Sequence, residues 1–133
     1  MALLTKASDA SLDAASAMYA PQRSGLTAGE ALDAYAPCYI KASDGRVYMS
    51  NGTAANEAAE FDGFTPRAYA SGESSVTLFG IGTKMRYATG LTPGAVYYIG
   101  ATAGRLDTAA TTGDAVGVAR SINATTIRII RDA

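Results

Sequence analysis

Residues 39–47 read Tyr-Ile-Lys-Ala-Ser-Asp-Gly-Arg-Val, and residues 98–106 read Tyr-Ile-Gly-Ala-Thr-Ala-Gly-Arg-Leu. In each stretch an apolar pair is followed by small and polar residues, then by Gly-Arg and another apolar residue. A glycine at such a position supplies the positive φ angle that a tight hairpin turn needs. The two stretches therefore predict a β-hairpin at two places in the chain.

The repeat extends on both sides of these hairpins. Three further pairs of segments recur in the same order: 25–29 with 90–94, 63–64 with 117–118, and 75–78 with 126–129. One half of this kind is too small to bury its own apolar face, so the two halves are expected to close on each other. The alternative interpretation is that short β units converge on similar turn chemistry.

Short runs typical of strands recur along the chain with turn residues between them. We expect strands at 35–41, 47–50, 64–70, 76–79, 85–88, 95–99, 116–120 and 126–131. This spacing favours a sheet of short antiparallel strands over alternating strands and helices. The prediction is an all-β fold: a closed or partly open barrel, or a sandwich, of about seven or eight strands.

The first 23 residues differ from the rest, because they contain no glycine and are rich in alanine. Ser8 or Asp9 is a suitable cap for a short helix that runs to about Met18, and Pro21 would end it. We divide the chain into an N-terminal arm, extended or helical, at 1–23 and a β-barrel domain at 24–133. The arm is interpreted as a segment that becomes ordered against a neighbouring subunit; the alternative is a helix packed on its own domain or a frayed terminus.

Composition excludes several function classes. The chain has 133 residues, a net charge of −1, one cysteine and no histidine. A near-neutral chain is not expected to bind nucleic acid through phosphate contacts, and no apolar run is long enough to span a bilayer. The absence of histidine removes the commonest general base and metal ligand. The first six residues do not resemble a secretory signal, so synthesis in the cytoplasm without export is expected.

Candidate chemistry is sparse. Glu57 and Glu60 would share one face of a helical turn, and with Asp62 they form the one weak candidate for a cation, although a solvated loop is the favoured interpretation. Cys38 lies in an apolar strand and is expected to be a buried hydrophobe. The basic and aromatic cluster at 84–87 is interpreted as a strand edge. We predict no catalytic residue, no cofactor and no metal. An alternative function is that of a biotin- or lipoyl-carrier domain, which would need a lysine at a hairpin tip.

Several segments resemble the small β-barrel head decoration (cement) proteins of tailed bacteriophages, a module also found in tail fibres. The segments that carry this resemblance are 26–32, 39–48, 70–78, 90–94, 97–99, 111–113 and 116–119. The resemblance covers about residues 24 to 131 and leaves out the arm. Turn chemistry alone accounts for single segments, whereas the ordered set is more specific.

The resemblance implies a virion structural protein, made in the host cytoplasm, that sits on the outer capsid surface. Such proteins, often homotrimers, stabilise the shell by clamping neighbouring major capsid subunits. The expected partners are therefore the major capsid protein and further copies of this chain, with no nucleic acid and no membrane. The alternative is a tail-fibre, baseplate or host-surface-binding β module.

Contact residues are expected in the arm and among the tyrosines. Tyrosine suits a wet interface because it combines a large apolar ring with a polar hydroxyl. Tyr97 and Tyr98 are adjacent, so one of them faces the core and the other faces outward. The predicted partner contacts are Leu3, Leu4, Leu12, Met18, Tyr19, Tyr35 and Tyr97.

Overall fold

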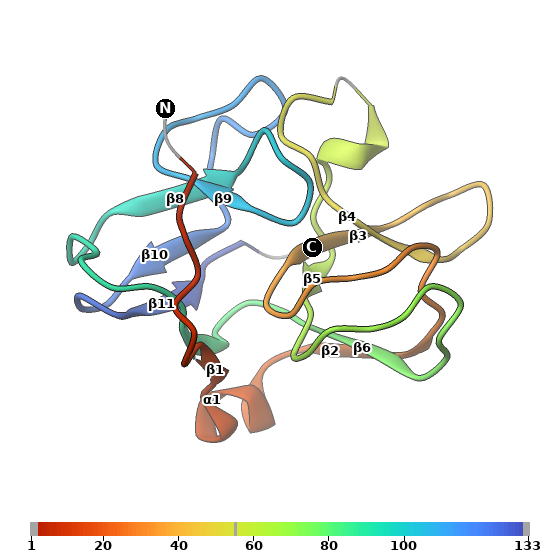
Figure 1. Ribbon diagram of the computed structural model, residues 1–133, viewed down its shortest axis with the longest axis horizontal. Coiled ribbons are helices and arrows are strands. Elements are labelled where there is room, and N and C mark those ends of the chain that lie inside the picture. The colour runs from red at the N-terminus through yellow and green to blue at the C-terminus, as the bar shows by residue number, and fades with distance from the viewer. Residues whose placement is uncertain (1–2, 55, 132–133) are drawn as a thin grey trace.

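The computed structural model describes residues 3–54 and 56–131, and it places their strands in two antiparallel sheets (Figure 1). The five-stranded sheet has the order β2-β6-β5-β3-β4. Its strands are β2 (Gln22–Leu26), β3 (Pro37–Ile40), β4 (Val47–Met49), β5 (Gly63–Phe64) and β6 (Val76–Phe79). A 3-10 helix, η1 (Glu57–Ala59), lies between β4 and β5.

The six-stranded sheet has the order β1-β7-β11-β10-β8-β9. Its strands are β1 (Ser11–Leu12), β7 (Lys84–Arg86), β8 (Val96–Ile99), β9 (Leu106–Asp107), β10 (Ala119–Ser121) and β11 (Thr126–Ile129). The two sheets lie side by side in Figure 1, and the short helix α1 (Ala14–Tyr19) lies at the bottom of the view. The all-β prediction is confirmed in its sandwich form, since the described strands form no closed barrel.

The two sheets share one topology. When five is added to each strand number, the order β2-β6-β5-β3-β4 becomes β7-β11-β10-β8-β9, which is the order of the second sheet without β1. Every pairing in both sets is antiparallel. The repeat in the sequence thus corresponds to a repeat in the fold, in which each half forms one sheet.

The hairpins agree in register as well as in order. Ile40 pairs with Val47, and Ile99 pairs with Leu106, so both hairpins close over the same number of residues. Gly45 and Gly104 both have positive φ, at 68° and 78°. The hairpin turns are therefore equivalent, as the sequence repeat predicts.

The strand register corrects the repeat alignment at 63–64, and it also shifts the match of 75–78 by two residues. Cys38 pairs with Gly63 in the first sheet, and Tyr97, the equivalent of Cys38, pairs with Ala119 in the second. Gly63 therefore corresponds to Ala119 and not to Gly117. The displacement is two residues, so each side chain stays on the same face of its sheet.

The apolar cores show how the halves are joined. One cluster belongs to the first half alone, and its buried members are Ala28, Leu32, Ala36, Cys38, Val47, Tyr69, Val76 and Leu78. The other cluster contains residues from the second half, such as Met85 and Ile127, together with Phe61 and Phe64 from the first half. The second core is thus completed by aromatic rings that the first half supplies.

Residues 3–13 run along the six-stranded sheet before the chain enters the other half (Figure 1). Leu4 donates to the Leu106 carbonyl at 2.8 Å, Ala7 donates to the Tyr87 carbonyl at 2.8 Å, and β1 pairs with β7. These backbone bonds hold the segment against its own domain. The segment then turns through α1 into β2.

The elements differ from the expected ones mainly at their ends. Helix α1 is capped by Asp13, not by Ser8 or Asp9, because the residues before Asp13 are used in strand β1. The expected strand at 64–70 shrinks to Gly63–Phe64, since Pro66 cannot donate to a ladder. Strands β1 and β2 were not expected, and β9 was implied only by the hairpin predicted at 98–106.

Candidate functional site

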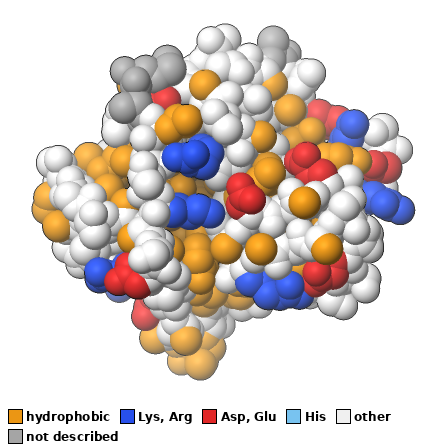
Figure 2. Space-filling model, viewed as in Figure 1, with side chains coloured by type: hydrophobic (Ala, Val, Ile, Leu, Met, Phe, Trp, Pro, Cys, Tyr) orange, Lys and Arg blue, Asp and Glu red, His pale blue; other side chains and the backbone are white. Residues whose placement is uncertain are grey.

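Helix α1 carries two of the three most exposed large apolar side chains among the described residues. Met18 is 69% exposed and Tyr19 is 86% exposed, whereas their neighbour Ala17 is buried. In the space-filling view the corresponding bottom end of the molecule is covered by apolar side chains (Figure 2). We call Met18 and Tyr19 the α1 tip.

The α1 tip is held rigidly by polar contacts at both ends of its helix. The Asp13 carboxylate accepts a bond from the Ser16 amide at 3.1 Å, and the Ser16 hydroxyl accepts a bond from the Lys84 amide at 2.9 Å. At the other end the Gln22 side chain donates to the Ala17 carbonyl at 2.9 Å. The apolar tip is therefore presented on an ordered support.

The neighbours of the Asp13 carboxyl lower its pKa. Ser16 lowers the pKa of this carboxyl, first through its side chain and then through its amide, and Lys84 lowers it further. Asp13 is thus ionised at neutral pH, and a charged acceptor stabilises the first turn of a helix.

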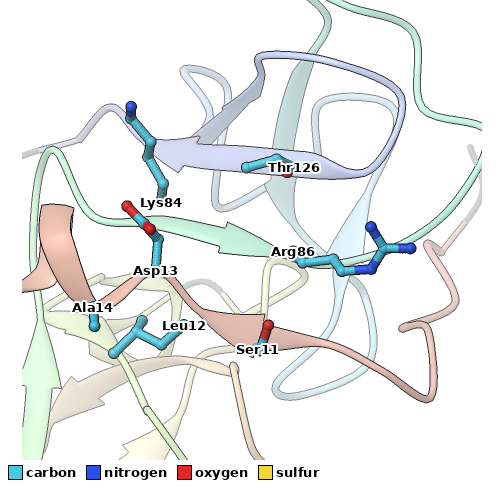
Figure 3. A pocket seen from close by; sticks show the side chains of 7 residues that line it. All are labelled: Ser11, Leu12, Asp13, Ala14, Lys84, Arg86 and Thr126. Atoms are coloured by element: carbon cyan, nitrogen blue, oxygen red, sulfur yellow. The ribbon is translucent and has the colours of Figure 1, made fainter.

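A shallow pocket of about 370 Å³ lies beside the helix, over β1, β7 and β11 (Figure 3). Its lining residues are Ser11, Leu12, Asp13, Ala14, Lys84, Arg86 and Thr126. Arg86 is paired with Asp9 at 2.8 Å. The polar lining and the open shape suit contact with a polar surface of another macromolecule.

A second pocket, of about 320 Å³, lies on the same sheet over β10 and β11. Its lining residues are Gly94, Arg120, Ser121, Ile122 and Arg128. In the strand register Arg120 lies opposite Arg128, and Arg128 lies opposite Lys84. We call Arg120, Arg128 and Lys84 the cation row.

Six of the seven predicted contact residues fall into two groups. Met18, Tyr19 and, at 37% exposure, Leu3 are open to solvent. Leu4, Leu12 and Tyr35 are partly buried and pack against the core of the second half.

Tyr97 is 4% exposed and belongs to that core, so its assignment as a contact residue is wrong. The alternation of the strand places Tyr97 inward and leaves Tyr98 half-buried. Periodicity alone shows that two adjacent tyrosines point to opposite faces, but it does not show which one points to the core.

Two of the three candidate carboxylates of the sequence make contacts that serve the fold, and the third, Glu60, is exposed. Glu57 accepts a bond from the Ala42 amide, and Asp62 is paired with Arg23 and accepts a bond from the Ile40 amide. Among residues 3–54 and 56–131, no group of three or more acidic, cysteine or histidine side chains is placed to hold a metal ion.

Cys38 is fully buried, and burial raises the pKa of its thiol, with smaller effects of the same sign from Glu30 and Asp33. A buried neutral thiol of this kind behaves as a small apolar side chain. The expectation of a buried hydrophobe at this position is confirmed.

Sequence reasoning missed the cation row. Arg120 and Arg128 each lie between two buried residues of their strands, so alternation alone indicates that they face outward. Their alignment with Lys84 depends on the register of three strands, which the sequence does not specify locally.

Comparison with protein-family models, with curated proteins and with solved structures finds no match for this chain. In the described part of the chain, no helix has the length and apolar character needed to cross a membrane.

Proposed function

We propose that this chain is a virion structural protein that decorates the outside of a phage capsid and stabilises it by clamping neighbouring major capsid subunits. The resemblance of residues 24–131 to phage decoration proteins supports this function, and the all-β fold of two like halves is compatible with it. The proposed partners are the major capsid protein and further copies of this chain in a homotrimer.

The observation that carries the proposal is the α1 tip. An exposed methionine next to an exposed tyrosine on a short helix is a costly arrangement in water, and both side chains contribute strongly when buried at an interface. The helix lies between β1, which pairs with β7, and β2, which pairs with β6. Because both flanking segments are fixed, the tip binds without the ordering cost of a disordered arm.

The rest of the arm has a supporting role in this proposal. Leu4 and Leu12 pack on the core, so contact with a shell is assigned to the tip and to Leu3. A trimer presents three such tips to a symmetric surface, and binding of the first tip raises the effective concentration of the others. Binding to the assembled shell alone stabilises that shell by mass action.

The test replaces both tip residues by serine, in the double variant Met18→Ser/Tyr19→Ser. We expect binding to empty expanded capsids to weaken at least about tenfold, as is usual when buried aromatic anchors are removed. Co-sedimentation with capsids measures the affinity, and light scattering measures the oligomeric state of the free variant.

The matched control is Val116→Ser, because Val116 is 74% exposed but lies in the loop before β10. It should bind capsids as the unmodified protein does. Unchanged capsid binding by the tip variant would show that the α1 tip is not part of the interface. Failure of the unmodified protein to bind capsids, with binding to tails or to the host surface instead, would replace the proposal by the tail-module alternative.

A further inference from the structure

Three cations lie opposite one another across neighbouring strands on the outer face of the six-stranded sheet. Arg120 on β10 pairs with Arg128 on β11, and Arg128 pairs with Lys84 on β7. Side chains that are directly opposite in antiparallel strands have Cβ atoms about 5 Å apart, and like charges there are destabilising. The isolated protein therefore carries an unfavourable contact in its cation row.

The described residues do little to neutralise this charge. Arg128 has no hydrogen-bond or ion-pair partner within 3–54 and 56–131, and the Arg120 Nε donates to the neutral Gly94 carbonyl at 3.1 Å. Asp13 lies beside Lys84, but its carboxylate accepts the bond from Ser16. The two arginines are the part of the row that is left with free donors.

An apolar side chain borders the arginines. Ile122 is 45% exposed and lines the pocket of about 320 Å³ together with Arg120 and Arg128. Arginine next to an exposed apolar residue is a combination enriched at protein interfaces. The pocket has room for an apolar side chain that would cover Ile122.

We propose that the cation row binds an acidic segment of a partner protein. Two carboxylates of that segment pair with Arg120 and Arg128, and an apolar neighbour on the same segment enters the pocket over Ile122. The planar guanidinium groups match carboxylate geometry and supply paired donors. Binding also relieves the repulsion between the two arginines.

The size of the row favours a protein segment over a nucleic acid. The row crosses three strands, about 10 Å in all. It ends beside Asp13 on one side and at Val96, the partner of Arg120, on the other. A phosphate backbone that ran past the row would meet a carboxylate, on a chain whose net charge is already −1.

The cation row is a different surface from the α1 tip, and an acidic partner segment there adds a binding role beyond the proposed function. Its test needs no capsid. If the chain fails to bind capsids, the proposed function falls while the peptide experiment still decides the role of the cation row.

The experiment titrates the protein with a short peptide of alternating glutamate and leucine, followed by ¹⁵N NMR that includes the arginine Nε–H signals. We expect shifts at Arg120, Arg128 and Ile122. In the variant Arg120→Gln/Arg128→Gln the affinity should fall about tenfold, as expected from the loss of two exposed ion pairs. The melting temperature of this variant at low salt should rise, because the like-charge contact is gone.

The matched control is Lys41→Gln/Arg46→Gln, which also removes two positive charges, but from the β3–β4 hairpin of the other sheet. It should bind the peptide as the unmodified protein does. Equal loss of affinity in both variants would overturn the proposal, since net charge alone would then explain binding. The proposal also fails if the unmodified protein shows no shifts, or if a short oligothymidylate binds at the row more tightly than the peptide.

Discussion

Gly45 and Gly104 are equivalent residues of the two hairpins, yet their surroundings differ. Both have positive φ, but a Cβ on Gly45 would meet open space, whereas a Cβ on Gly104 would clash with the Met49 sulfur and touch Ala36. Met49 and Ala36 belong to the first half. The second hairpin is thus packed against the first sheet, while the first hairpin projects into solvent.

This difference predicts unequal costs for the same substitution. Gly45→Ala should lower the free energy of unfolding by roughly 1–2 kcal/mol, the cost of a left-handed conformation with a Cβ. Gly104→Ala carries that cost and also pushes the flexible Met49 side chain aside, which adds about 1 kcal/mol, the low end of the usual cost of overpacking. Urea unfolding of both variants measures the difference.

Met49→Ala in the Gly104→Ala background supplies the control, because it makes room for the new methyl group. The double variant should lose less stability than the sum of the two single variants. Equal costs at Gly45 and Gly104, or strict additivity with Met49→Ala, would contradict the close packing of this hairpin.

At the scale of elements, burial decides which strands can be read from the sequence. Strand β6 was predicted with its observed bounds, Val76–Phe79, because its residues alternate between buried and half-buried. Strand β2 was missed, since four of its five residues are exposed and give no apolar alternation. Such edge strands are held by backbone bonds to a neighbour, which local sequence does not reveal.

Helix α1 offers a pH-dependent prediction. The hydrogen bonds from Ser16 hold the pKa of Asp13 below its ordinary value of 3.8, so the folded state binds the proton less readily than the unfolded chain. The helix cap therefore stabilises the fold above that ordinary value, and its contribution is lost as the pH falls through the lowered pKa. The Ser16 amide signal in NMR should titrate with a midpoint below pH 3.8.

Asp13→Asn is the matched variant, because asparagine also caps helices but does not titrate in this range. Its Ser16 amide signal should stay constant through the same pH interval. A midpoint at or above the ordinary aspartate value in the unmodified protein would show that the carboxylate does not cap α1 in solution.

At the scale of the whole molecule, the sequence repeat was sufficient to predict two like halves but not how they meet. The turn glycines and the apolar pairs of the hairpins are local signals, and the shared strand order follows them. Phe61 and Phe64 belong to the first half of the chain but pack in the core of the second half, and this breaks the symmetry of the repeat. The cation row likewise requires the register of strands that are distant in the chain, so neither feature could be read from one segment.

The shared core predicts that the two halves unfold together. Phe64 is fully buried and packs edge-on against Phe61, with ring centroids 5.4 Å apart, among residues of the second half. Phe64→Ala should lower the free energy of unfolding by about 3–5 kcal/mol. Because the ring lies on β5 of the first sheet but fills the other core, the loss should affect both sheets equally.

Calorimetry and NMR test this together, with Val76→Ala as the comparison, since Val76 is buried in the core that belongs to the first half alone. Each variant should show one transition at a lowered temperature, with the signals of Val47 and Ile127 lost at the same midpoint. Phe64→Leu, a milder change, gives the same readout if the alanine variant does not fold. The contrary result is two separate transitions in the Val76→Ala variant, with Ile127 still ordered after Val47 has melted. It would show that the halves unfold independently and that the packing of Phe61 and Phe64 in the second core does not couple them.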